Sequence, residues 1–434
     1  MRIFQLLYHY LRTLLETNLL PKNIAQYIVK RRKEKYLKWL VHNSPYYSKY
    51  KEIKRLEDLP MGNKSMLMDN FDKINTKGLK KENCFDLALK SENDRNFSSM
   101  IGDISVGLSS GTSGNRGLFC ANSSERALWA GIILAKVLPR SILSKQKIAL
   151  FLRANNNLYD RLNSNKIIFC FFDMIIPLKE QINSLESYNP DYLVAPASVL
   201  CQIAKCIESK SLKITPTKIF SAAEVLDKAD EAYLERVFNQ KIHQLYQCTE
   251  GFLASTCSHG NLHINEEYII VEKEYLDKKN GRFIPIITDL FRKTQPIVRY
   301  RLNDILVENT DSCPCGSHHL RLNAIEGRED DIFFFKHIES NEEVAVYPDF
   351  LRRAVISAND EIDEYRVIQY SAKEIEVQIL SNSNISEITN SIRSNFDALF
   401  EKLNIQKPTI EFKQYKALDI TQKRKRIERV HKGN

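Results

Sequence analysis

The sequence predicts an α/β protein with a large N-terminal layered α/β domain, residues 1–329, and a small C-terminal α+β domain, residues 330–434. Two observations predict it. In the large part, short apolar runs alternate with polar segments of helical spacing, which is typical of parallel sheets covered by helices. After residue 331 the runs alternate between apolar and polar residues around one amphipathic helix, which is typical of a small α+β domain.

The alternation of apolar runs and helical segments in the large domain is clearest from residue 147 onward. Its apolar runs, which we expect to be buried strands, are 148–152, 167–172, 192–195 and 218–222. The segments 197–205 and 230–238 have helical spacing and lie between or after these runs. Strands that alternate with helices in this way form layered α/β structures.

The small domain is predicted from three alternating runs, residues 365–370, 374–380 and 409–415. Between the second and third run, apolar residues recur every three or four positions, which places them on one helix face. They are Ile385, Ile388, Ile392, Phe396, Leu399 and Leu403.

Composition limits the class of protein. The chain has 434 residues, 43% of them hydrophobic, and a formal charge of +9. No apolar run approaches the ~20 residues that span a bilayer. Residues 1–20 predict an amphipathic helix packed on the body, which leaves peripheral contact with a membrane surface open. The basic cluster 423–426 lacks the aromatic residues of a nucleic-acid platform, so we expect no nucleic-acid partner.

Nine cysteines in a long chain without an export signal indicate reduced thiols and metal ligands in a cytoplasmic protein. Cys313 and Cys315 lie on one tight turn, and Cys257 and His263 lie upstream. Thiolates with imidazole favour tetrahedral zinc, so these four residues are the predicted structural zinc ligands. Three further histidines remain alternative ligands: His259, His318 and His319.

Residues 108–117 contain three glycines and four hydroxyl residues in an otherwise glycine-poor chain. Glycine lets backbone N–H groups turn toward an anion, and hydroxyl groups add donors, so this segment predicts a phosphate-binding loop. It lacks the Gly-Lys-Ser/Thr ending of a Walker loop.

This loop resembles the Ser-Ser-Gly-Thr-Thr-Gly loop of the adenylate-forming enzymes. Three further segments follow in the order of that superfamily: 245–251 resembles its Tyr-Gly-x-Thr-Glu motif, 297–304 its Arg-Tyr-Arg-x-Gly-Asp motif, and 326–331 its hinge. Segments 56–60 with Lys64, 152–159 and 288–296 resemble the branch of phenylacetate–coenzyme A ligases, deazaflavin-coenzyme adenylyl synthetases and related capsule-biosynthesis proteins.

The resemblance implies that the N-terminal domain binds ATP and substrate and that the C-terminal domain is mobile. Glu250 would hold magnesium, Thr249 would reach the α-phosphate, and Lys423, with Lys425 as rival, would neutralise charge during adenylation. The phenylacetate-ligase branch binds zinc through a similar set of cysteines and a histidine, so the resemblance also implies a zinc site here. By the same resemblance, Asp304 would bind the ribose, and Ala223, Glu224 and Tyr246 would contact the adenine. The remaining nucleotide-binding residues implied by the resemblance are Ser109, Ser110, Gly111, Thr112, Ser113, Gly114, Arg116 and Arg328.

The implied activity is ATP-dependent activation of a small carboxylic acid as acyl-AMP with release of pyrophosphate, followed by transfer to coenzyme A or another acceptor. Two alternatives stay open: an adenylyltransferase that leaves AMP on a cofactor or hydroxyl group, and a non-catalytic nucleotide-binding member in surface-polysaccharide biosynthesis. The acid, the acceptor and the oligomeric state are not predicted.

Overall fold

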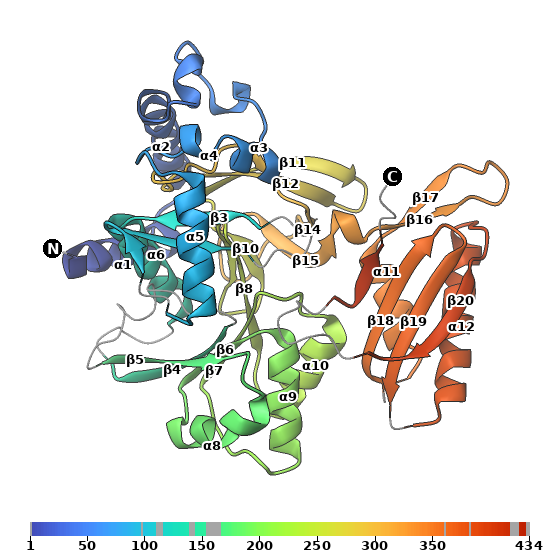
Figure 1. Ribbon diagram of the computed structural model, residues 1–434. Helices are drawn as coiled ribbons and strands as arrows, with labels where there is room; N and C mark the ends of the chain where they lie inside the picture. Colours follow the sequence, from blue (N-terminus) through green and yellow to red (C-terminus); the bar gives the residue numbers. More distant parts are fainter. Residues whose placement is uncertain are drawn as a thin grey trace. The chain divides into compact units, whose positions relative to one another are not determined.

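The computed structural model describes residues 2–96, 99–109, 116–138, 144–152, 166–359, 362–381, 383–416 and 425–430. The chain divides into two compact units (Figure 1). The first comprises Met1–Leu302 and Glu308–Asn323, and the second Asn303–Val307 and Ala324–Asn434. The division therefore passes through two strands, β14 (Asp304–Asn309) and β15 (Arg321–Arg328).

The first unit begins with a helical region. Its elements are α1 (Arg2–Asn18), α2 (Lys22–Asn43), η1 (Tyr47–Tyr50), η2 (Leu56–Asp58), α3 (Lys64–Asp69), α4 (Phe71–Ile74) and α5 (Lys81–Asn93). As expected, the first helix packs on the body, where it lies against α6 (Ser123–Val137). None of the described helices combines the length and apolar character that crossing a bilayer requires.

A buried polar network lies beneath α1. Glu267 forms an ion pair with Lys136 at 2.7 Å, and Thr17 Oγ1 donates to the same carboxylate at 2.8 Å. Burial alone would raise the pKa of Glu267, but Lys136 and His319 lower it to about 2. The network therefore holds a buried carboxylate in its charged form and joins α1 to the interior.

A three-stranded antiparallel sheet follows, in the order β1 (Met100–Ile101), β2 (Ile104–Leu108) and β3 (Leu118–Ala121). Helix α6 begins directly after β3 with a capping box, in which Asn122 Oδ1 accepts the backbone N–H of Glu125 and Glu125 accepts that of Asn122. The cap stops β3 and turns the chain into the helix.

The main sheet has the strand order β11-β12-β14-β15-β10-β9-β8-β7-β6-β4-β5. The predicted apolar runs form its parallel part: β4 (Gln146–Leu152), β5 (Ile167–Asp173), β6 (Tyr192–Ala195) and β7 (Lys218–Ala222), followed by β8 (Ile242–Cys248). The associated helices are α8 (Leu178–Tyr188), α9 (Ala197–Glu208) and α10 (Lys228–Phe238), and α9 lies beside α10 (Figure 1). One apolar core lies between these strands and helices.

In the rest of this sheet, the strand pairs β8–β9, β9–β10, β10–β15, β11–β12 and β12–β13 are antiparallel. This part of the sheet contains β9 (Gly251–Thr256), β10 (Leu262–Ile264), β11 (Ile269–Asp277), β12 (Arg282–Asp289) and β13 (Tyr300–Arg301), which pairs with β12. Long hairpins such as β11–β12 keep neighbouring segments of the sequence adjacent in space.

The second unit has its own core. A four-stranded sheet in the order β20-β19-β18-β21 joins the three predicted strands to a fourth, and α11 and α12 accompany it (Figure 1). The remaining elements are η3 (Glu329–Asp331), β16 (Phe333–Lys336), β17 (Glu343–Val346), α11 (Pro348–Ile356), β18 (Ile362–Ser371), β19 (Glu374–Ser381), α12 (Ile385–Lys402), β20 (Thr409–Gln414) and β21 (Ile427–Arg429). On α12 the predicted face is buried at Ile388, Ile392 and Phe396, whereas Ile385 is exposed.

Candidate functional site

The predicted phosphate loop connects β2 with β3. Hydrogen bonds between Ser109 and Gly117 close the base of this loop, which is called the neck below. Leu108 of β2 pairs with Leu118 of β3. Next to this pair, the Ser109 N–H donates to the Gly117 carbonyl at 2.8 Å, and Ser109 Oγ accepts the Gly117 N–H at 2.8 Å. The expected phosphate contacts Ser110 to Gly114 lie outside the described residues. The described part of the segment is thus a hydrogen-bonded base for the loop.

Arg116 closes the same neck. Its Nε donates to the Ser109 carbonyl at 2.9 Å, and its two terminal nitrogens donate to the Glu92 carboxylate at 2.7 and 2.6 Å. This bidentate pair ties the neck to α5. Glu92 was not singled out from the sequence, because nothing local indicates that it meets Arg116.

Gly117 leaves room for a lysine beside the neck. A Cβ at this position would lie 3.3 Å from Lys64 Cε and 3.5 Å from Ser109 Oγ. Lys64 is the first residue of α3, whose N-terminus is capped by Asn63. The structure therefore places the aliphatic part of a basic side chain against the base of the loop.

The Thr249–Glu250 pair forms the tip of the β8–β9 hairpin, where Cys248 pairs with Gly251. Thr249 Oγ1 donates to Glu250 Oε2 at 2.8 Å, and both residues are half-buried. Tyr246 lies on β8 and is buried, with 8% of its surface exposed. The turn thus presents a hydroxyl group and a carboxylate side by side, which are the hard oxygen donors that suit magnesium.

A buried polar bridge joins this turn to the strand that follows the phosphate loop. Arg292 donates to the Thr249 carbonyl at 2.8 Å and to Gln295 Oε1 at 3.2 Å. Gln295 accepts the Cys120 N–H and donates to the Leu118 carbonyl, both at 2.9 Å. The free edge of β3 and the Thr249–Glu250 turn are therefore held by one connected set of hydrogen bonds.

Sequence reasoning assigned no role to Arg292 or Gln295. Both lie in the segment 288–296 that resembled the branch, but their partners are 43 and 175 positions away. The same segment contains Asp289, which accepts the Phe291 and Arg292 N–H groups. Burial raises the pKa of Asp289 to about 6, and Arg292 acts in the opposite direction.

Ala223 and Glu224, the expected adenine-contacting residues, follow β7. Ala223 has a φ of 65°, a left-handed conformation that is uncommon for a residue with a Cβ. Glu224 accepts the Ser198 N–H at 3.0 Å at the beginning of α9. Glu224 therefore stabilises the N-terminus of α9. The positive φ of Ala223 strains the backbone, and such strained residues are frequent at functional sites.

The second unit brings Asp304 and Arg328 together on neighbouring strands, with Arg328 Nε 3.8 Å from Asp304 Oδ1. Asn303, which stands where the superfamily pattern has glycine, donates to Asp330 at 3.0 Å. The candidate ribose-binding carboxylate is thus close to the segment expected to be the hinge.

Lys423 lies outside the described residues, but its rival Lys425 is described. Lys425 donates to Asp331 Oδ1 at 3.1 Å. Burial raises the pKa of Asp331, and Lys425 acts in the opposite direction. This ion pair anchors the chain just before β21 to the segment that follows β15.

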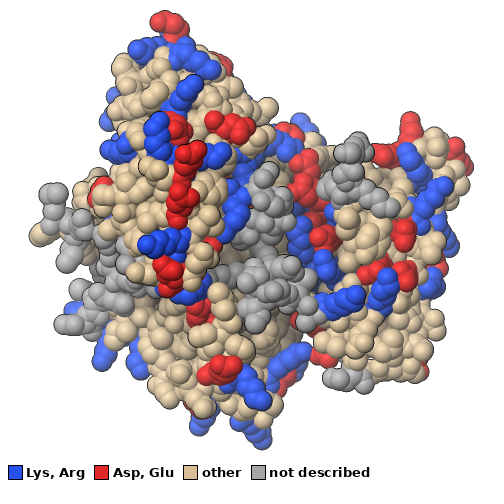
Figure 2. Space-filling model, viewed as in Figure 1, with Lys and Arg blue, Asp and Glu red and all other residues tan. Residues whose placement is uncertain are grey.

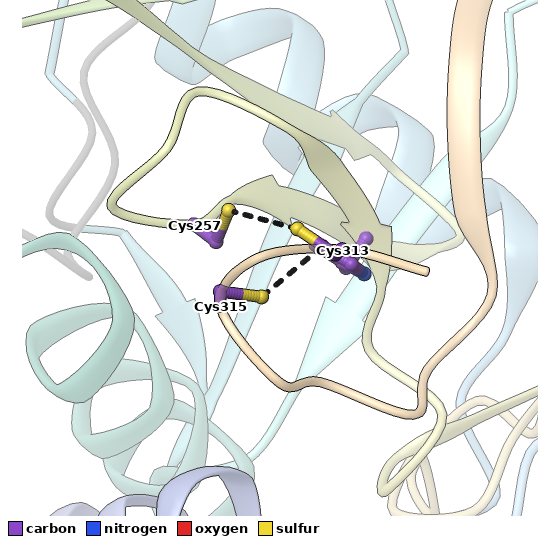
Figure 3. Close-up of side chains that lie close together, drawn as sticks. Cys257, Cys313 and Cys315 are labelled. Carbon is purple, nitrogen blue, oxygen red and sulfur yellow. Dashed lines mark hydrogen bonds between the residues drawn. The ribbon is translucent and has the colours of Figure 1, made fainter. Parts of the chain in front are cut away.

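The four predicted zinc ligands lie together in the first unit. Cys257, His263, Cys313 and Cys315 each offer one ligand atom, and these atoms all lie within 4.8 Å of one another. The Cys257 and Cys313 sulfurs are 3.8 Å apart (Figure 3). Cys315 Sγ is 3.6 Å from His263 Nε2. Usual zinc bond lengths give tetrahedron edges of ~3.8 Å between two sulfurs and ~3.6 Å between sulfur and nitrogen.

The surroundings orient these ligands. His263 Nδ1 is 3.2 Å from the His319 carbonyl, so Nδ1 is the donor nitrogen and Nε2 faces the thiols. Asn261 donates to Cys313 Sγ at 3.3 Å, and the Ser317 N–H donates to Cys315 Sγ at 3.4 Å. Of the alternative histidines, His319 instead lies 3.5 Å from the carboxylate of Glu267.

Comparisons with known proteins agree with the fold. No protein-family model matches the chain. Protein CapK from Staphylococcus aureus is 25% identical over 221 residues, which cover 50% of this chain and 47% of CapK. A phenylacetate–coenzyme A ligase from Thermus thermophilus is 24% identical over 113 residues, 24% of each chain. The matched part is thus less than half of either relative.

Among solved structures, 2-hydroxyisobutyryl-CoA ligase in the postadenylation state, in complex with 2-HIB-AMP, superimposes with a TM-score of 0.69. The match has 15% sequence identity and covers 93% of this chain and 89% of the ligase. Because the match extends over nearly the whole of both chains, it shows a shared fold. The chain therefore has the fold of the acyl-coenzyme A ligases of the adenylate-forming superfamily, which its sequence motifs resemble.

Proposed function

We propose that this protein activates a carboxylic acid with ATP. The acid's carboxylate oxygen attacks the α-phosphorus, the bond from that phosphorus to the oxygen bridging the β-phosphate breaks, and acyl-AMP and pyrophosphate form. The chemistry requires donors and cations around a polyphosphate whose negative charge shifts during the reaction.

The observation that carries the proposal is the bridge through Arg292 and Gln295. It joins the strand after the serine- and glycine-rich loop to the Thr249–Glu250 turn. A loop suited to the β- and γ-phosphates and a turn suited to magnesium and the α-phosphate need a defined separation, because reacting groups must be held in register. The bridge supplies a rigid connection between them.

The remaining roles rest on the motifs. Glu250 would hold magnesium, which would screen phosphate charge, and Thr249 would donate to the α-phosphate. The loop residues Ser109 to Gly114 would donate to the outer phosphates while Arg116 keeps the neck closed. Tyr246, Ala223 and Glu224 would border the adenine.

In the second unit, Asp304 would accept the ribose hydroxyls and Arg328 would donate to ribose or phosphate. Lys423 would neutralise the attacking carboxylate and the α-phosphate. Lys425 is engaged by Asp331, which favours Lys423 for this role. The charge of Lys423 is needed only while adenylation proceeds, so a mobile C-terminal domain that delivers it is consistent with transfer of the acyl group in a second step.

The acceptor of the second step is coenzyme A or another nucleophile. The ligase with which the structure superimposes acts with coenzyme A, as its name states. In this chain the segment after the hinge forms the β16–β17 hairpin, and Phe333 and Phe335 are buried in the core of the second unit. The hairpin therefore contributes to the core, and product analysis has to identify the acceptor.

The first test is ATP–pyrophosphate exchange with a panel of aryl, fatty and hydroxy acids. We expect exchange that depends on one class of acid, and a loss of about 100-fold or more in Glu250→Gln and Lys423→Ala, because each change removes charge stabilisation in the transition state. The exposed residues Glu339 and Lys402 provide matched controls, as Glu339→Gln and Lys402→Ala. Thermal melts of all four variants separate lost chemistry from lost folding.

The products separate the proposed ligase from the alternative. A ligase ends with free AMP and an acylated acceptor, whereas an adenylyltransferase leaves AMP on its acceptor. Absence of exchange with every acid, together with AMP attached to a hydroxyl compound, would refute carboxylate activation.

A further inference from the structure

Helix α1 carries an uninterrupted apolar row on its outer face. Its residues recur at intervals of three or four, so they lie along one side of the helix. The exposed fractions are 77% for Phe4, 60% for Tyr8, 62% for Leu11 and 46% for Leu15. Beyond the helix Leu19 is 71% exposed, and on α2 Ile24 and Tyr27 are 44% and 61% exposed. A row of exposed apolar side chains on a folded body indicates a binding surface.

The opposite face of α1 is fixed to the body, so the helix does not turn its apolar row inward. Thr13 Oγ1 lies 2.6 Å from the Tyr268 hydroxyl, and the Arg12 guanidinium lies 4.8 Å from the Phe291 ring centre. At Gly131 of α6, a Cβ would lie 2.8 Å from the Leu6 carbonyl oxygen. The two helices therefore touch through backbone, and the exposed row is a stable property of the docked helix.

The charges next to the row are predominantly basic. The one acidic residue of α1, Glu16, is buried and paired with Arg32 of α2. Helix α2 begins beside the end of the row and contains a single acidic residue, Glu34, which is exposed and lies 3.6 Å from the Arg31 guanidinium. Its exposed basic residues are Lys22, Lys30, Arg31, Lys35 and Lys38. Figure 2 shows basic side chains at several places on the lobe that contains α2.

We propose that α1 and the exposed face of α2 form a docking surface for an anionic lipid bilayer. Phe4, Tyr8, Leu11 and Leu15 would enter the boundary between headgroups and acyl chains, with α1 lying in the plane of the membrane. The basic side chains of α2 would contact the lipid phosphates. An apolar helix face next to clustered lysines and arginines is the pattern of interfacial membrane binding.

Charge favours a bilayer over a second copy of this chain. A two-fold dimer places the same surface on both partners. Joining two copies along this row would bring two sets of exposed α2 cations together, whereas an anionic lipid surface is complementary to them. The inference is independent of the proposed chemistry, since it rests on residues outside the candidate site.

The test is co-sedimentation of the full chain with vesicles of phosphatidylcholine, alone or mixed with phosphatidylglycerol. We expect binding to the mixed vesicles that weakens as salt is raised. Leu11→Ser with Leu15→Ser should weaken it by about tenfold or more, because two apolar side chains no longer enter the membrane. Lys30→Gln with Lys35→Gln should weaken it by roughly 25-fold, about fivefold for each charge.

Matched controls carry the same changes elsewhere on the surface. The apolar pair Ile338→Ser with Leu380→Ser and the basic pair Lys179→Gln with Lys213→Gln alter exposed residues outside α1 and α2 and should bind like the unmodified chain. Equal binding to neutral and anionic vesicles, or unchanged binding of the α1 variant, would overturn the proposal. So would a dimer in light scattering that the α1 variant dissociates, because the row would then be a self-association surface.

Discussion

Removal of metal from the cysteine–histidine cluster provides a quantitative test of the zinc prediction. Cys257 and Cys313 are 56 positions apart and would be joined through the ion. In the chain-entropy treatment, closing a loop of this length removes unfolded-state entropy worth about 4 kcal/mol at 25 °C. We therefore expect Cys313→Ser, or chelation of the unmodified protein, to lower the free energy of unfolding of the first unit by about that amount.

Tryptophan fluorescence suits the measurement because Trp39 and Trp129, the two tryptophans of the chain, both lie in the first unit. Urea unfolding is followed with and without chelator, and zinc content is measured on protein purified without added metal. We expect one zinc per chain and recovery of stability when zinc is restored. Cys206→Ser, outside the cluster, is the control and should keep both metal and stability.

The reasoning fails if the protein contains no metal and the chelator leaves the urea midpoint unchanged. A metal-free but equally stable protein would mean that hydrogen bonds alone hold the four side chains together. Loss of stability in Cys313→Ser without loss of metal would also contradict the assigned ligand set.

Three further changes test the packing and electrostatics of the first unit. Gly131→Ala should destabilise the first unit by about 1–3 kcal/mol, because the added methyl group meets the backbone of α1. Gly107→Ala, where an added Cβ has no atom within 4 Å, is the control and should be close to neutral. The urea midpoints of the two variants are compared. Ala223→Gly should raise the free energy of unfolding by up to about 1 kcal/mol, because glycine adopts the positive φ without strain. Ala222→Gly, at a position without that strain, should lower the free energy of unfolding. Equal losses of stability in both variants would show that the Ala223 backbone is not strained. The pKa of Glu267 in the folded protein is about 2, below its ordinary value, so its contribution to the free energy of unfolding is present above about pH 4.5 and is lost as pH falls toward 2. The unmodified protein should lose up to about 3 kcal/mol of stability over this range. The free energy of unfolding measured against pH should change less in Glu267→Gln.

Local periodicity accounts for how much of the fold could be predicted. The runs 192–195 and 218–222 became β6 and β7 with the same bounds, and the helix from residue 385 became α12, because burial of one face depends on spacing within a short segment. Strand β21 and the β16–β17 hairpin were not predicted. Residues 427–429 are too few to show a pattern and become a strand only by pairing with β18.

The sequence alone determined the superfamily resemblance, the expected phosphate loop and Thr249–Glu250 motif, and the four possible metal ligands that the structure brings together. These follow from residue types at short spacings, where backbone and ligand chemistry impose local rules. Only the tertiary structure decided that Arg292 and Gln295 join the loop strand to the turn, that Lys425 is held by Asp331, and that the apolar row of α1 stays exposed. Each depends on partners far away in the chain, and packing of the whole fold decides which distant groups meet.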